Sequence, residues 1–245
     1  MKSSVVRKYH RLALSKKFTT RALAILGTLI LLIAALTIYG TQTGNFVVSV
    51  KNVNRNESIA LSVEEDRSNE ISRLVANPLK DCIDGCYMDI PDNIDEGLGS
   101  KNDKYGRYLA MSFYLINNGT TTRNVAMDFR ITQVTKRIDT ILRVMIIQDG
   151  ERTFFSKARE DVDDGDGLGE PIWGFDYSGR YFLKNAEAFD DEYIVHKTIN
   201  DFEKGSSIKF TIVMWLDGLD DQNPDGNREM LGGALKTELN FSIIG

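Results

Sequence analysis

The sequence predicts an antiparallel β-sandwich that follows a single N-terminal transmembrane helix. Three observations support this prediction. Short apolar or alternating runs, bounded by turn residues, recur between residues 45 and 243. An Asp-Gly pair joins two of these runs, and a charge-free apolar stretch near the start follows a block of positive charge. With 245 residues and 42% hydrophobic content, the chain is long enough for one domain with a buried core plus an appendage.

The N-terminal part predicts a membrane segment. Residues 1–21 contain seven Lys and Arg residues and no acid, and residues 22–40, which begin "ALAILGTLILLIAALTIY", carry no charge. A helix of about 18 residues spans roughly 27 Å, close to the thickness of a bilayer core. Basic flanks stay on the cytoplasmic side, which makes 1–21 cytoplasmic and 41–245 extracellular. Because no Ala-x-Ala pattern follows, a single-pass signal anchor in the cell membrane is favoured. The alternative is a cleaved signal peptide and a secreted protein.

The predicted extracellular domain, residues 41–245, is acidic. Without the seven positive residues of the head, 23 Lys and Arg face 35 acids, a net charge of about −12. This charge repels phosphate backbones, so no nucleic-acid partner is expected. The basic head is interpreted as a topology signal that contacts anionic lipid headgroups.

Eight strands are predicted from runs rich in β-branched and aromatic residues. They cover residues 45–51, 58–64, 108–117, 125–134, 142–148, 152–158, 208–216 and 234–243. Strands at this spacing are typical of an antiparallel sandwich. Asp149-Gly150 predicts a tight hairpin. The charge spacing of "TKRIDTILR", residues 135–143, predicts a short helix that caps the sheet.

Two long segments, 77–107 and 159–192, are predicted to be acidic loops. They are rich in Asp, Asn and Gly, which favour turns, and loops of this length usually carry a function. The second loop contains an aromatic cluster that either folds back over the sandwich or stacks on a sugar or a protein partner. Its members are Trp173, Phe175, Tyr177, Tyr181 and Phe182.

Cys82 and Cys86 are the two cysteines of the chain. Four residues apart in an exported protein, they predict a disulfide that closes a small ring and adds modest, local stability. Two thiols do not complete a zinc site, which needs four ligands.

The stretch "DDQNPDGNREM", residues 220–230, resembles the start of a calcium loop. Alternating oxygen donors converge on a cation when the backbone coils around it, and Gly226 stands where that coil needs its sharp turn. Position twelve is Gly232 and not Glu, so the segment is not an EF-hand. Calcium binding remains an alternative to a solvated acidic turn. The candidate calcium ligands are Asp221, Asn223, Asp225, Asn227 and Glu229.

A second acidic stretch lacks the register of a calcium loop and is interpreted as a solvated loop, with weak calcium binding as the alternative. It comprises Asp161, Asp163, Asp164, Asp166 and Glu170.

The C-terminal segment "IVMWLDGLDDQNPDGNREMLGGALKTELNFSI" resembles the ending of TasA/camelysin-like exported proteins of Gram-positive bacteria. The shared features are W-L-[DE]-G after an apolar strand, an acidic Asp-Pro-Asp-like turn, a Gly-Gly pair and a final strand that ends in an aromatic residue. The stretches "IDTILRVMIIQDGERTFFSK" and "YGTQTGNFVVSV" are also similar to that family.

The resemblance implies a jelly-roll-like sandwich at the cell surface, which in some members assembles into biofilm matrix fibres by exchange of a terminal strand. The long basic N-terminal segment departs from the secreted, fibre-forming members. Some camelysin-like members are linked to metalloprotease activity. A His-x-x-x-His zinc site needs two histidines, however, and His196 is the only one outside the basic head.

These observations predict a membrane-anchored cell-surface module that binds or assembles, with its own copies or other surface proteins as partners, and no enzyme activity is expected. Two alternatives are an exported hydrolase that uses acidic residues and a carbohydrate-binding module that uses the aromatic loop.

Overall fold

The structure is a computed structural model that describes residues 26–28, 46–51, 58–158, 168–175, 181–190, 193–217 and 230–244, with backbone alone at 173–175 and 181–183. The chain divides into two units, Met1–Thr43 and Gly44–Gly245. In the first unit residues 26–28 are helical, and the rest of the predicted membrane segment 22–40 lies outside the described residues. Among those described, no helix is long and apolar enough to cross a membrane.

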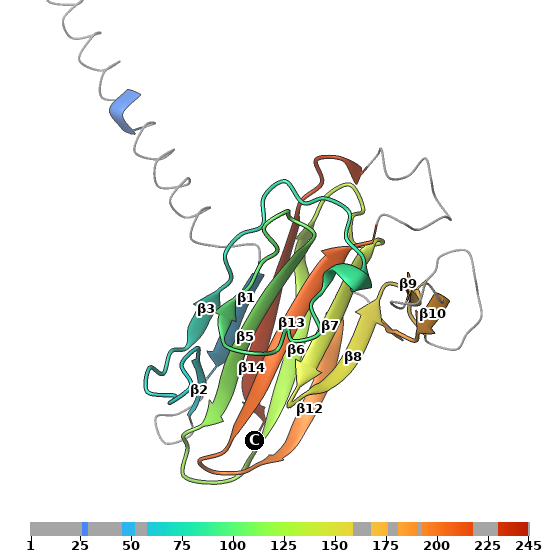
Figure 1. Ribbon diagram of the computed structural model, residues 1–245. Helices are drawn as coiled ribbons and strands as arrows, with labels where there is room; N and C mark the ends of the chain where they lie inside the picture. The colour runs from blue at the N-terminus through green and yellow to red at the C-terminus, as the bar shows by residue number, and fades with distance from the viewer. Residues whose placement is uncertain are drawn as a thin grey trace, which may run out of the picture. The chain divides into compact units, whose positions relative to one another are not determined.

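The second unit is a sandwich of two packed sheets, which confirms the all-β prediction (Figure 1). The five-stranded sheet has the order β12-β6-β14-β1-β3, and the seven-stranded sheet has the order β11-β8-β7-β13-β5-β2 with β4 on β5. The first comprises β1 (Phe46–Lys51), β3 (Arg73–Val75), β6 (Arg123–Val134), β12 (Tyr193–Phe202) and β14 (Leu235–Ile244). The second comprises β2 (Ile59–Ser62), β4 (Gly99–Ser100), β5 (Tyr108–Asn117), β7 (Leu142–Gln148), β8 (Glu151–Ser156), β11 (Glu187–Ala188) and β13 (Ser207–Leu216).

All eight predicted strands are present, but both sheets are mixed and not purely antiparallel. β1 runs parallel to β14, from Phe46 opposite Thr237 to Lys51 opposite Ser242. β11 runs parallel to β8. Neither pair is joined by a hairpin, so no tight turn forces its strands to run in opposite directions.

Asp149-Gly150 forms the predicted hairpin between β7 and β8. Gln148 pairs with Glu151 across the turn, and the two central residues have φ angles of 47° and 91°. Positive φ at both positions is the requirement of the turn that matches the twist of paired strands, and the Asp-Gly sequence meets it at low cost.

The short helix predicted at 135–143 is wrong. Lys136 and Arg137 have φ angles of 55° and 52°, a left-handed conformation that a right-handed helix excludes. The segment is instead a turn, closed by a hydrogen bond from the Thr140 N–H to the Arg137 carbonyl. The described second unit does contain one 3₁₀ turn, η1 (Tyr87–Asp89), within the loop 77–107.

The main core lies between the two sheets. Three aromatic rings, those of Phe113, Phe210 and Phe241, pack together in it, with centroid separations of 5.4 to 6.2 Å. Burial of such rings removes large apolar areas from water and stabilises the sandwich.

A second apolar cluster covers the outer face of the seven-stranded sheet. Met145 and Val213 are fully buried there beneath Ile90 and Ile94, which belong to the segment 77–107. We call this segment the strap. It was predicted to be a turn-rich loop, and in the structure it covers the sheet, so the seven-stranded sheet is apolar on both faces.

Candidate functional site

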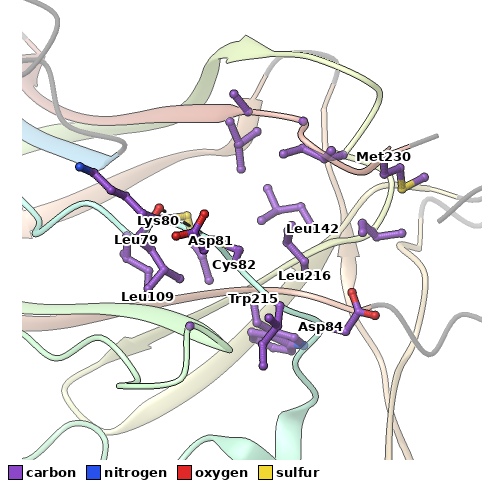
Figure 2. A pocket seen from close by; sticks show the side chains of 18 of the residues that line it. Leu79, Lys80, Asp81, Cys82, Asp84, Leu109, Leu142, Trp215, Leu216 and Met230 are labelled. Carbon is purple, nitrogen blue, oxygen red and sulfur yellow. Dashed lines mark hydrogen bonds between the residues drawn. The ribbon is translucent and has the colours of Figure 1, made fainter. Parts of the chain in front are cut away.

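A pocket of about 680 Å³ opens at the end of the sandwich where β13 ends and β14 begins, the upper end in Figure 1. Its volume is in the range of small-molecule sites. Figure 2 shows Leu142 and Leu216 in the middle of the pocket, with Leu79 and Leu109 on one side and Met230 on the other. Leu109 and Leu142 belong to the main core, so the floor of the pocket is the end of that core.

One wall of the pocket is the start of β14 and the residues before it. Gly232 has a φ angle of 73°, which L side chains rarely adopt. A Cβ atom at Gly233 would come within 2.3 Å of the Ile138 side chain. The Gly-Gly pair noted in the sequence therefore lets this wall turn sharply against the loop between β6 and β7.

Two polar groups that line the pocket already have partners within the protein. The buried Thr237 hydroxyl donates to Met214 Sδ at 3.6 Å, and the Leu216 carbonyl accepts from the Gly85 N–H at 2.9 Å. Groups that are satisfied in this way offer no directed hydrogen bond to a ligand. What remains for a ligand is mainly apolar surface, together with the buried indole N–H of Trp215, which has no hydrogen-bond partner among the described residues.

The rim of the pocket combines exposed apolar and charged side chains. Leu231 is 71% exposed and Ile83 is 51% exposed. Lys80, Asp81, Asp84 and Lys236 are also among the lining residues. An apolar interior with a rim of both charge signs suits a ligand that has an apolar part and a charged or zwitterionic end.

A buried ion pair lies beside the pocket. Arg143 Nε is 3.8 Å from Asp217 Oδ2, and the two side chains are 1% and 7% exposed. Arg143 also donates to the Thr140 carbonyl at 3.0 Å, and the Asp217 N–H donates to the Ile141 carbonyl at 2.8 Å. The Asp of the W-L-[DE]-G motif thus fixes the end of β13 against the start of β7.

The sequence analysis did not single out Arg143. Arg143 could have been noticed as a charged residue inside the otherwise apolar run "LRVMII". A charge buried in such a run requires a partner of opposite charge. The partner could not be chosen from the sequence, since many acids are available.

Cys82 and Cys86 are free thiols in the structure. The Cys86 thiol contacts Asp89 Oδ2 at 3.4 Å, whereas Cys82 lines the pocket near the Leu79 carbonyl. Burial raises the pKa of both thiols, and Asp89 raises that of Cys86 further. The predicted disulfide stays a prediction for the oxidised protein.

The candidate calcium ligands Asp221, Asn223, Asp225, Asn227 and Glu229 lie outside the described residues. So do Asp161, Asp163, Asp164 and Asp166, while Glu170 is described and buried. Across the ranges that the structure does describe, no group of three or more His, Cys, Asp or Glu residues is placed to hold a metal ion. Calcium binding by 221–229 stays a prediction.

The aromatic segment 159–192, predicted as a loop, contains two paired strands, β9 (Ile172–Phe175) and β10 (Tyr181–Lys184). Trp173 and Phe175 belong to β9, Tyr181 and Phe182 belong to β10, and Tyr177 lies outside the described residues. Ile172 is fully buried in the second apolar cluster, so the start of β9 packs against the seven-stranded sheet.

His196 lies on the outer face of the five-stranded sheet and is 63% exposed. Its Nδ1 is 2.6 Å from Asp128 Oδ1 on the neighbouring strand. Asp128 pairs in register with Asn240, and Asn240 pairs with Ser49, whose hydroxyl donates to the Asn240 side chain. His196, Asp128, Asn240 and Ser49 thus form a row across four neighbouring strands. Asn240 lies between the Asp-His pair and the serine, which is not the order of a catalytic triad.

Comparisons with protein-family models, with curated proteins and with solved structures found no match to this chain. The resemblance to TasA/camelysin-like proteins rests on the quoted motifs alone. The structure supplies a physical reason for two of those motifs, at Asp217 and at Gly232-Gly233.

Proposed function

We propose that the protein is a cell-surface binding module, held in the membrane by residues 22–40 and displaying the sandwich outside the cell. The observation that carries this proposal is the apolar pocket at the end of the sandwich. It has the volume of a ligand site and keeps apolar side chains at its mouth, where folding alone would favour polar ones.

Binding is favoured over catalysis because of how the titratable residues lie. Asp89 and Asp103 both form ion pairs with Arg107. Asp139 pairs with Lys157 at 2.7 Å, and Asp217 pairs with Arg143. These carboxylates stabilise the fold through partners of opposite charge, while hydrolysis needs carboxylates that converge on a substrate. An exported hydrolase remains the weaker alternative.

Binding is also favoured over assembly through strand addition. β12 is a ten-residue edge strand, but its pairing with β6 shifts register twice, and Asp201 within it has a φ angle of 53°. Bulges and charges such as Lys197 discourage a further strand from pairing with an edge. The jelly-roll-like classification and a role in a biofilm matrix are proposals that rest on the family resemblance.

The test is the location and topology of the full chain in cells. The protein should fractionate with membranes, and an external protease should remove the sandwich from intact cells while residues 1–21 stay protected. A chain recovered from the cytosol, or one that resists external protease until the cells are lysed, would contradict the proposal. Mass spectrometry of the mature N-terminus separates the anchored protein from a secreted one.

A further inference from the structure

We infer that the pocket takes an acyl chain from a phospholipid of the membrane in which the protein is anchored. The inference rests on the proposed membrane anchor and names the ligand of the proposed binding site. It depends on three features of the described residues: the chemistry of the pocket interior, the charges at its rim, and the end of the sandwich at which the chain enters.

The interior suits an aliphatic chain. The side chains at its centre are aliphatic, with Leu142 and Leu216 between Leu109 and Met230. The Thr237 hydroxyl and the Leu216 carbonyl are already hydrogen-bonded within the protein. Transfer of apolar surface from water into such a pocket is favourable by roughly 25 cal/mol per Å². A sugar or a peptide backbone would leave most of its polar groups without partners there, because the one unpartnered buried side-chain donor among the described lining residues is the Trp215 indole N–H.

The rim suits a zwitterionic headgroup. Lys80 and Lys236 offer ammonium groups to a phosphate, and Asp81 and Asp84 offer carboxylates to the headgroup amine. Both pairs line the mouth of the same pocket, together with the exposed side chains of Leu231 and Ile83. Exposed apolar residues among charged ones are typical of surfaces that meet a lipid interface.

The chain enters the sandwich at the pocket end. Phe46 is the first residue of β1, and its register partner Thr237 lines the pocket. Only residues 40–45 separate Phe46 from the end of the predicted apolar helix at Tyr39. Six residues reach at most about 20 Å when fully extended. The connection between the predicted helix and the start of β1 is therefore short, and β1 starts at the pocket end of the sandwich.

Trp215 makes the inference measurable, because it lines the pocket and is 2% exposed. The chain has one other tryptophan, so Trp173→Phe leaves Trp215 as the sole indole. The full-length variant would be reconstituted into vesicles of phosphatidylethanolamine and phosphatidylglycerol whose acyl chains are brominated near their ends. Bromine quenches an indole only at short range, so Trp215 should lose most of its emission relative to vesicles of unbrominated lipid.

Two substitutions in the Trp173→Phe background give a matched comparison. Ala234 is exposed and lines the pocket, so Ala234→Phe should fill it and remove most of the quenching. Ala158 is exposed and is not among the lining residues, so Ala158→Phe should leave the quenching unchanged. If Ala234→Phe fails to fold, alkylation of Cys82 in a Cys86→Ser variant is a second way to fill the pocket.

Flotation of the same vesicles keeps the inference separate from the proposed anchor. Protein that floats with the vesicles but shows no quenching, or equal quenching in the Ala234→Phe and Ala158→Phe variants, would overturn the acyl-chain inference and leave the anchor intact. Protein that does not float would overturn the anchor, and with it the inference. Quenching that is lost in the Ala234→Phe variant but kept in the Ala158→Phe variant would establish the pocket as the acyl-chain site.

Discussion

The outer faces of the two sheets differ, although both sheets contribute to the same core. On the five-stranded sheet, β6 alternates between buried residues and partly exposed polar ones, and its outer face carries the row of His196, Asp128, Asn240 and Ser49. On the seven-stranded sheet, six of the seven residues of β7 are buried without alternation. The difference teaches that an unbroken apolar strand requires a cover on each face.

The cover of the seven-stranded sheet is held by positively charged residues. Arg107 bonds to Asp89 and Asp103, Lys101 donates to the Ile94 carbonyl at 2.7 Å, and Arg152 bonds to the Asp92 carbonyl. Apolar contacts beneath the strap and ionic contacts along it thus fix a segment that has little regular structure. The outer face of the five-stranded sheet needs less cover, because it carries polar side chains such as His196 and Asp128 beside a few apolar ones such as Val75.

The largest expected effect is on the covered side, at the buried ion pair. Asp217→Ala should lower the free energy of unfolding by about 3–5 kcal/mol, because Arg143 would keep its buried charge without this acid. Urea unfolding measures the loss. On the polar side, Glu238→Ala breaks the exposed pair with Arg130 and should cost less than about 1 kcal/mol. Equal losses would abolish the distinction between the two faces.

Truncation of a buried apolar side chain in the strap should have the next largest effect on stability. Ile94→Ala should cost about 2–4 kcal/mol, because Ile94 is 4% exposed in the second apolar cluster. The control on the other sheet is Val75→Ala, which removes a 41% exposed side chain and should change stability by less than about 0.5 kcal/mol. A strap that merely lay on the surface would give similar small values for both variants.

Acid should weaken the strap through Asp103. The hydrogen bond from Arg107, followed by the bonds of nearby backbone N–H groups, holds the pKa of Asp103 below its usual range. A depressed carboxyl pKa stabilises the fold at neutral pH, and this contribution disappears as the pH falls below about 4. Arg107→Met should cost about 1 kcal/mol at pH 7. As the pH is lowered, the unfolding free energy of the Arg107→Met variant should fall less steeply than that of the parent. If the two unfolding free energies fell in parallel with pH, this account of Asp103 would be wrong.

The thiols of the strap should react slowly. Because the pKa of Cys82 and of Cys86 is raised, iodoacetamide at neutral pH should modify both more slowly than it modifies the unfolded chain, with the exposed Cys82 reacting before Cys86. Intact mass gives the rates. If the predicted disulfide forms in the exported protein, alkylation with and without reductant must differ by two thiols.

The smallest effect is expected at the polar row. His196→Ala should change stability by less than about 0.5 kcal/mol near neutral pH, because the ring is 63% exposed and its contact with Asp128 is open to solvent. Thermal unfolding of the variant and the parent at one pH checks this value. A loss comparable to that of Ile94→Ala would mean that the polar face is covered in the intact protein.

Much of the sandwich could be predicted because its strands carry their pattern locally. The run 108–117 coincides with β5, and Asp149-Gly150 marked the hairpin correctly. β12 was missed because only a few of its residues are buried, as expected for an edge strand. The helix prediction at 135–143 failed because charge spacing is a weak indicator. The turn that forms there bonds to residues distant in sequence, through the Thr135 N–H to the Ala234 carbonyl and the Lys136 ammonium group to the Leu231 carbonyl.

The candidate site was harder to predict than the fold. The pocket is built from the strap, β7, β13 and β14, and no local pattern indicates that these segments meet. The role of the strap was nevertheless present in the sequence as an indirect signal. Strands such as "LRVMIIQ" need a cover on both faces, and Ile90 and Ile94 in the acidic loop are suitable residues for it.

β1 has a mechanical consequence. It lies inside the five-stranded sheet, with β14 on one side in parallel and β3 on the other. Tension applied parallel to this strand shears the hydrogen bonds to both neighbours together and does not open them one after another. A domain attached in this way should resist traction from flowing liquid or from a moving neighbour far better than one attached through a peripheral hairpin.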